Sequence, residues 1–170
     1  MRVVLQIVKN ASVTIEEKLY SQINEGFLLL VGFNNEDNEE VIKKVIDKII
    51  SLRIFPDENG KTNLGFLDLD KELLCVSQFT LYADIKKGRR PSFVNALRPE
   101  EATKLYDFTL EYLKSKVKVV KGGVFGADMK VNLLNLNVLG YPYLYPLFPL
   151  NIKKLLNKVF RKNTKNNKKL

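Results

Sequence analysis

Short apolar runs separated by polar turns dominate the beginning of the chain. Runs of strand length cover 2–8, 11–15 and 26–33, and the turn-prone pair Lys9-Asn10 separates the first two. The third run, GFLLLVGF, is apolar throughout, which is typical of a strand buried on both faces. Apolar residues then recur at helical spacing from about Asn38 to Arg53, with acidic residues at the front of the segment. The pattern predicts buried strands followed by a helix.

The middle of the chain continues this alternation. Strand patterns occupy 71–78, 117–120 and 129–134, and the break Gly122-Gly123 precedes the last of them. Pro99 suits the first turn of a helix. The apolar face of that helix is predicted to hold Leu105, Phe108, Tyr112 and Leu113. Many strands and few helices predict an α+β domain in which two main helices cover a largely antiparallel sheet.

The pattern changes after Asn135. Residues 136–150 are mostly apolar but contain three prolines within eight residues, which neither a helix nor a central strand accepts. This run is also shorter than the roughly 20 residues that cross a bilayer. Residues 151–170 are rich in Lys and Asn, and we expect them to be disordered or to form a short basic amphipathic helix. We therefore divide the chain into a domain at 1–145 and a basic tail at 146–170.

The positive charge of the chain is concentrated in that tail. The chain has 28 basic and 19 acidic residues, a net charge of +9. Eight of the basic residues and none of the acids lie in 151–170, so the tail holds +8 and the rest of the chain only +1. The domain therefore does not attract its binding partner through a large uniform electrostatic field.

The chain contains no histidine and one cysteine, Cys75. This composition excludes zinc sites built on histidine, Ser-His-Asp triads and Cys-His dyads, because each needs an imidazole. Cys75 lies in an apolar run and is expected to be a small buried hydrophobic residue. The chain opens directly as a strand, without the pattern of a secretory signal, so a cytoplasmic protein is expected. We expect no metal, no cofactor and no membrane partner.

The polar stretch SQFTL at 77–81 ends one of the strand patterns. The period of a strand places Ser77 and Phe79 on one face, and Gln78 and Thr80 on the other. Hydroxyl and amide groups at the end of a strand are candidates for a catalytic edge. An ordinary half-buried strand explains the same alternation.

Two further stretches contain candidate binding residues. At 86–92 a cluster of cations surrounds Gly88, which lets the backbone approach a ligand, and Pro91 stiffens the segment that follows. This combination suits an anion, and a solvated basic turn is the simpler explanation. The small residues of GGVFGADM at 122–129 leave room for a ligand or for a neighbouring strand.

Together and in this order, these stretches resemble the D-aminoacyl-tRNA deacylases. The similarity begins with MRVVLQ at 1–6 and continues through LRIF at 52–55. It then covers VSQFTLYADIKKGRRPSF at 76–93 and FGADMKV at 125–131, and it ends at Asn135. The resemblance implies a cytoplasmic, homodimeric, barrel-like α+β enzyme. Such an enzyme hydrolyses the ester that joins a D-amino acid, or glycine, to the terminal adenosine of a tRNA.

The resemblance also implies roles for the candidate residues. Backbone N–H groups around Phe79 and Thr80 would stabilise the oxyanion, and Ser77 and Gln78 would shape the adenosine pocket. Thr80 as a covalent nucleophile is the alternative, which is weaker because a hydroxyl needs a base and the chain has no imidazole. The residues expected on the aminoacyl side are Phe125, Gly126, Ala127 and Met129. The loop expected to bind the phosphates of the acceptor end holds Lys86, Lys87, Gly88, Arg89, Arg90, Pro91 and Ser92.

The chain departs from the family pattern at two places. The family continues Asp-Gly-Pro-Val-Thr after the residue that matches Asn135, where a cis Gly-Pro reaches into the partner's pocket and excludes L-amino acids, but this chain reads LNVLG at 136–140. The family usually has Arg at the position of Ile7, which is associated with holding that Gly-Pro in place. The filter against L-amino acids therefore cannot be assigned to any residue of this chain. The alternative function is that of a catalytically impaired homologue that binds the ends of tRNA or other RNA.

A frameshift near Asn135 is one hypothesis for the altered end. The segment GYPYL at 140–144 can be encoded by DNA that reads Val-Thr-Leu-Ile one base later. That is the kind of sequence the family places after its Gly-Pro. Resequencing of the gene tests this hypothesis directly.

Overall fold

The computed structural model describes residues 1–86, 88–136 and 145–147. Within them, a seven-stranded sheet has the order β2-β1-β3-β6-β7, and β8 and β9 also pair with β1. The strands of this sheet are β1 (Arg2–Ile15), β2 (Lys18–Ile23), β3 (Gly26–Gly32), β6 (Glu72–Ser77), β7 (Val120–Gly122), β8 (Met129–Asn135) and β9 (Tyr145–Leu147). A small second sheet pairs β4 (Arg53–Pro56) with β5 (Thr62–Gly65), and short 3-10 helices, η1 (Phe66–Asp68) and η2 (Phe79–Tyr82), precede and follow β6.

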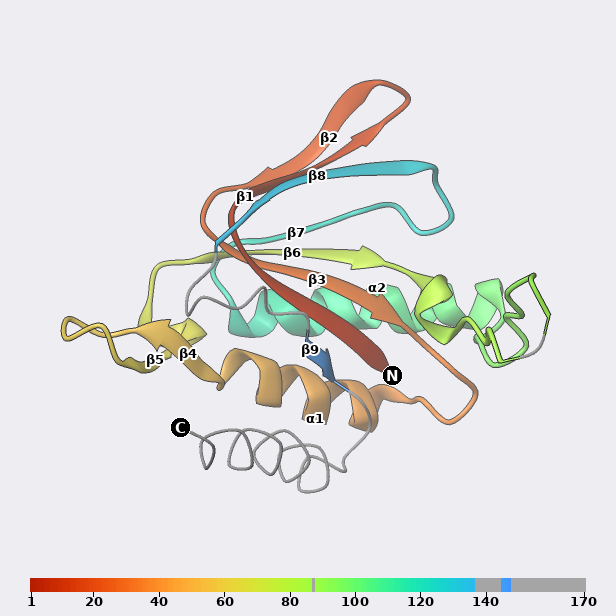
Figure 1. Cartoon of the computed structure of the whole chain (residues 1–170), viewed down its shortest axis with the longest axis horizontal. Helices are drawn as coiled ribbons and strands as arrows, with labels where there is room; N and C mark the ends of the chain where they lie inside the picture. The colour runs from red at the N-terminus through yellow and green to blue at the C-terminus, as the bar shows by residue number, and fades with distance from the viewer. Residues whose placement is uncertain (87, 137–144, 148–170) are drawn as a thin grey trace, which may run out of the picture.

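The sheet curves into a nearly closed barrel, and both long helices lie against one of its faces (Figure 1). Strands β3, β6 and β7 are parallel to one another, whereas all pairs made by β1 are antiparallel. The Ser21 hydroxyl of β2 donates a hydrogen bond to the Gly122 carbonyl of β7 at 2.9 Å, which links the two ends of the strand order. The predicted α+β class with a largely antiparallel, barrel-like sheet and two main helices is confirmed.

Strand β1 organises the sheet because it changes partners along its length. Its first half pairs with β3, and its second half pairs with β2 and β8. The predicted turn at Lys9-Asn10 is wrong, since the strand continues through these two exposed residues. The register with β8 shifts between Val8 and Asn10, and such irregularities bend a strand without ending it.

The two helices pack between solvent and the sheet. Helix α1 (Glu39–Ile50) begins at the N-cap Asn38, whose side chain accepts a hydrogen bond from the Val41 N–H at 3.1 Å, but it ends before Arg53. Helix α2 (Pro99–Lys116) begins at the predicted proline. Its fully buried residues are Ala102, Tyr106, Thr109 and Leu113. The predicted face is therefore rotated, and three of its four members, Leu105, Phe108 and Tyr112, are only half-buried.

Strand β3 is buried on both faces, as its apolar run predicts. Phe27 and Leu29 belong to the core between sheet and helices, where Phe27 packs against Phe66 with ring centroids 4.5 Å apart. Leu28 belongs to a second core inside the barrel. The members of this second core are Val8, Ala11, Val13, Ile23, Leu28, Leu74 and Val76. Both sides of the sheet are thus stabilised by burial of apolar side chains.

The strand predictions fail mainly for short elements. Strands β2, β4 and β5 were not predicted, and β7 begins at Val120, where the predicted strand ends. Strand β9 places Pro146 opposite Val4 of β1, and a proline is tolerated there because β9 pairs with no other described strand. The predicted boundary between domain and tail falls inside β9. The predictions for 137–144 and 148–170 lie outside the described residues.

No helix in the described part of the chain is long and apolar enough to cross a membrane.

Candidate active site

A cavity of about 640 Å³ opens at one end of the sheet. Three segments line it, namely the end of β6, the approach to α2, and the turn that leads from β7 into β8. Figure 1 shows these three segments on the same side of the molecule. The lining residues are Val76, Ser77, Gln78, Phe79, Phe93, Ala96, Leu97, Arg98, Pro99, Phe125, Gly126, Ala127, Asp128, Met129 and Val131. A cavity of this size with a mostly apolar lining and a few polar groups is typical of a small-ligand site.

The segment 77–80 does not continue as a strand, so the predicted alternation of its side chains is wrong. Gln78 N–H still donates to the Val31 carbonyl at 2.6 Å, and the chain then turns into η2. The hydrogen bonds of η2 are donated by the N–H groups of Leu81, at 3.3 Å, and Ala83, at 3.0 Å. The N–H groups of Phe79 and Thr80 come before these donors, so η2 does not use them. Within the described residues neither N–H makes another backbone hydrogen bond, so both can serve a ligand.

The side chains of 77–80 divide between cavity and solvent. Ser77, Gln78 and Phe79 line the cavity, and the Phe79 ring packs edge to face against Phe93 with centroids 5.0 Å apart. Thr80 is not one of the lining residues, and its hydroxyl accepts a hydrogen bond from the Gln78 side-chain amide. An amide NH₂ group cannot accept a proton from a hydroxyl. The geometry around Thr80 therefore contains no base for nucleophilic attack.

The four residues expected on the aminoacyl side all line the cavity. Their turn is held by Tyr106 of α2, whose hydroxyl accepts a hydrogen bond from the Gly123 N–H at 3.0 Å. The Tyr106 ring lies 6.0 Å from that of Phe125, and burial raises the pKa of the Tyr106 hydroxyl. A Cβ atom on Gly123 would lie 2.3 Å from the sulfur of Met129, so a larger residue there would displace the Met129 side chain that lines the cavity.

The basic loop lies outside the cavity. It is closed by two backbone hydrogen bonds between Asp84 and Ser92, at 2.8 and 2.9 Å, and Gly88 has a positive φ of 71° at its tip. Lys86, Arg89 and Arg90 are exposed, and no residue from Lys86 to Ser92 that the structure describes lines the cavity. Lys87 lies outside the described residues. The loop joins the cavity through Phe93.

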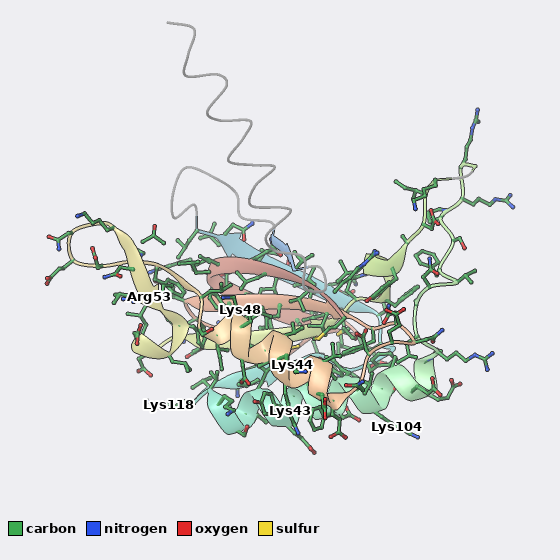
Figure 2. The ribbon with its side chains drawn as sticks, turned by 90° about the horizontal axis from the view of Figure 1, so that it is seen from below. Lys43, Lys44, Lys48, Arg53, Lys104 and Lys118 are labelled. Atoms are coloured by element: carbon green, nitrogen blue, oxygen red, sulfur yellow. The ribbon has the colours of Figure 1, made fainter. Side chains whose placement is uncertain are left out.

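A second set of cations lies on the helices, away from the cavity. Figure 2 shows Lys43, Lys44 and Lys48 on α1 and Lys104 on α2. Helix α1 has three acidic residues, Glu39, Glu40 and Asp47, against its three lysines, so the helix has no net charge. We interpret it as a solvated helix surface.

Sequence reasoning missed several lining residues. Pro99 was interpreted only as the start of a helix, Arg98 was given no role, and Asp128 was quoted in a small-residue stretch without a role. A local pattern could not assign them, because the cavity is formed by segments far apart in the chain. Cys75 is fully buried and burial raises the pKa of its thiol, which agrees with a packing role. No three Asp, Glu or Cys side chains in the described part of the chain converge as metal ligands.

The fold and the cavity define a class, that of small α+β barrel domains with a ligand-sized cavity at one end of the sheet. The family model for D-Tyr-tRNA(Tyr) deacylase matches residues 4–136. The chain belongs to this family. The match ends next to Asn135, where the sequence departs from the family pattern.

Individual relatives agree with this assignment. The D-aminoacyl-tRNA deacylase of Halothermothrix orenii is 49% identical over 135 residues, which are 79% of this chain and 91% of that protein. The D-aminoacyl-tRNA deacylase of Lactobacillus acidophilus is 53% identical over 135 residues, 79% of this chain and 93% of the relative.

Two solved structures share the fold. The c-Myc DNA unwinding element binding protein is 36% identical, with a TM-score of 0.80 over 87% of this chain and 98% of that chain. A probable eukaryotic D-amino acid tRNA deacylase is 16% identical, with a TM-score of 0.69 over 78% of this chain and 92% of that chain. The second likeness concerns the fold alone.

Proposed function

We propose that this chain hydrolyses the ester bond of D-aminoacyl-tRNA and releases the free D-amino acid and tRNA, a proofreading activity in translation. Membership of the deacylase family gives the reaction. The observation that carries the proposal for the site is the shared cavity. The end of β6 at Ser77 to Phe79 and the wall at Phe125 to Met129 line one space of about 640 Å³.

The reaction needs few groups from the protein. The oxygen of a water molecule attacks the ester carbonyl carbon, and the bond from that carbon to the ribose oxygen breaks. One proton of the water passes to the departing ribose oxygen, and the second leaves to solvent as the amino acid carboxylate forms. The N–H groups of Phe79 and Thr80, which η2 does not use, would stabilise the oxyanion, and the ribose 2′-hydroxyl of the substrate would activate the water.

The remaining site residues would position the substrate. Ser77 and Gln78 shape the adenosine side of the cavity, and Phe125, Gly126, Ala127 and Met129 form the aminoacyl side. The exposed cations of the loop, Lys86, Lys87, Arg89 and Arg90, would bind phosphates of the acceptor end outside the cavity, with Gly88, Pro91 and Ser92 shaping the loop. This arrangement gives affinity for tRNA without sequence choice.

The assembly and location of the enzyme follow from the resemblance to the family. We propose a cytoplasmic homodimer with a domain at 1–145, a basic tail from 146 onwards, and glycyl-tRNA as an additional substrate. Exposed apolar residues on β2 and β8, including Leu19 at 62% and Leu134 at 56% exposure, support a second copy as partner. Gel filtration with light scattering of the full chain tests the dimer.

Purified full-length protein with D-Tyr-tRNA and L-Tyr-tRNA tests the activity. Release of D-tyrosine with L-tyrosine spared supports the proposal, including chiral selection despite the altered end. Hydrolysis of both esters supports the oxyanion site and shows that the protein does not exclude L-amino acids. Binding of tRNA without turnover refutes the proposal and favours the impaired homologue that binds RNA ends.

A further inference from the structure

Two residues among those lining the cavity carry a charge, Asp128 and Arg98. Asp128 comes immediately before β8, in the wall that also holds Phe125 and Met129. Arg98 is the N-cap residue of α2, in the segment that also contributes Phe93 and Leu97. The negative and the positive charge therefore belong to different walls of one cavity.

Neither charge is neutralised by the described part of the protein. Asp128 and Arg98 form no ion pair with each other or with another described residue, and neither side chain makes a hydrogen bond within that part. Ion pairs elsewhere on this surface do form, for example Lys118 with Asp70 at 3.3 Å. Both residues are exposed, and two unpaired opposite charges in the lining of one cavity are suited to a ligand that carries both signs.

The end of an aminoacyl-tRNA is such a ligand. Its α-amino group is largely protonated near neutral pH, next to the ester carbonyl, and the phosphate on the 5′ side of the terminal adenosine carries a negative charge. We infer that Asp128 binds the α-ammonium group of the substrate and that Arg98 binds the phosphate of the terminal adenosine. This inference rests on the proposed function and names the groups of the substrate that the two charges recognise.

The Asp128 contact has a consequence for specificity. An ester whose α-amino group is acylated carries no positive charge there, and it would leave the Asp128 carboxylate without its partner. The cavity therefore selects aminoacyl esters with a free amine over N-acylated esters such as the end of a peptidyl-tRNA. Asp128, in the wall that also holds Phe125 and Met129, would thereby protect peptidyl-tRNA from hydrolysis during translation.

The Asp128 contact is tested with D-Tyr-tRNA and N-acetyl-D-Tyr-tRNA. We expect wild-type protein to prefer the free amine, and Asp128→Asn to lose about 10- to 100-fold in kcat/KM on the free amine only, the range for a hydrogen bond to a charged group. The matched control is Asp107→Asn, which removes an exposed carboxylate of α2 outside the cavity. An unchanged preference in Asp128→Asn, or an equal loss with both esters, would overturn the assignment.

The Arg98 contact is tested with D-Tyr-tRNA and the nucleoside ester 3′-D-tyrosyl-adenosine, which lacks the phosphate. Arg98→Gln is expected to raise KM for the tRNA substrate about tenfold or more and to leave the nucleoside ester unaffected. Lys104→Gln removes an exposed cation of the same helix that does not line the cavity and should change neither value. An equal effect of Arg98→Gln on both substrates would show that the residue acts only on the structure of α2.

A binding measurement separates this inference from the proposed function. The probe is the non-hydrolysable amide 3′-D-tyrosylamido-3′-deoxyadenosine, titrated calorimetrically into full-length wild type and Asp128→Asn. Weaker binding by Asp128→Asn supports the ammonium contact even if wild type hydrolyses no ester and the proposed function fails. Equal binding, or no binding to wild type, overturns the inference even if hydrolysis is present.

Discussion

The Tyr106 hydroxyl donates a hydrogen bond of 2.8 Å to the carbonyl oxygen of Cys75, in the buried layer between α2 and β6. The same hydroxyl accepts a hydrogen bond from the Gly123 N–H at 3.0 Å. Cys75 lies two residues before Ser77, and Gly123 lies two residues before Phe125. One buried side chain thus joins two of the segments that line the cavity.

Replacement of Tyr106 by Phe should therefore affect both stability and hydrolysis. The change leaves buried backbone groups with fewer partners, which costs about 1 to 3 kcal/mol in the free energy of unfolding. We expect kcat to fall more than KM rises, because the two walls lose their fixed relation while the binding groups remain. Denaturant unfolding and steady-state kinetics measure the two effects.

Tyr112→Phe is the matched control for this change. Its hydroxyl is on the same helix and donates to Asp47 at 2.8 Å, but at an exposed position. We expect a smaller loss of stability than for Tyr106→Phe, because the exposed groups that lose their partner are hydrated, and unchanged hydrolysis. If the Tyr106 variant lost stability but kept its kinetic constants, Tyr106 would have no role in positioning the walls.

The position of Tyr106 also shows where sequence reasoning reached its limit. The spacing of Leu105, Phe108, Tyr112 and Leu113 correctly indicates a helix, but it gives the wrong buried face. The inward residue is decided by polar backbone groups of β6 and of the turn after β7, which are distant in sequence. Helical periodicity contains no information on such partners.

Elements with strong local signals were predicted well. The apolar run of β3, the start of α1 near Asn38 and the proline that opens α2 all appear where expected. Strand β6 was predicted over 71–78 and ends at Ser77, but the 3-10 turn that begins at Phe79 was not predicted, because the alternation of Ser77 to Thr80 is also typical of a strand. The candidate stretches that line the cavity were identified by resemblance, whereas Arg98 and Asp128 could be assigned to the lining only from the folded structure.

Glu25 provides a pH-dependent contribution to stability. Hydrogen bonds from Lys71 and Lys9 lower the pKa of its carboxyl below the ordinary value, and the carboxylate thereby links the turn before β3 to β1 and β6. Because the folded-state pKa is lowered, this contribution is present above the unfolded pKa of about 4.3 and is lost as the pH falls through the folded value. Glu25→Gln should cost less than about 1 kcal/mol at pH 7, since the pair is partly exposed.

The measurement for Glu25 is the free energy of unfolding of wild type and variant at several pH values. The difference between the two proteins should shrink as the solution is acidified below about pH 4. Glu58→Gln, at an exposed turn position, serves as the control and should show no such trend. A difference that stays constant across the acidic range would assign the effect to packing rather than to ionisation.

A substitution of Thr80 distinguishes catalysis by positioning of the substrate from covalent catalysis by the Thr80 hydroxyl. Its hydroxyl is bonded to the Gln78 amide and does not line the cavity, so we expect Thr80→Val to keep kcat within about tenfold of wild type. A nucleophile would lose about 10³-fold or more on the same change. Single-turnover hydrolysis of D-Tyr-tRNA measures the effect, and Thr80→Ser is the control that keeps the hydroxyl. Loss of activity in Thr80→Val with recovery in Thr80→Ser would restore the covalent alternative.

The oxyanion role of the Phe79 N–H can be tested by a single backbone substitution. Phe79 is the first residue of η2, where proline is well tolerated, and Gln78 before it is not helical, with φ −147° and ψ 85°. Phe79→Pro therefore removes one N–H donor without breaking a hydrogen bond of η2.

The control for Phe79→Pro is Phe79→Ala, which also loses the ring packed against Phe93 but keeps the N–H. Loss of one oxyanion donor lowers kcat about 10² to 10³-fold, so Phe79→Pro should be slower than Phe79→Ala by that factor. The two variants should bind the amide analogue equally, because the donor stabilises charge that develops only during the reaction. Equal kcat values in two folded variants would remove the Phe79 N–H from the mechanism.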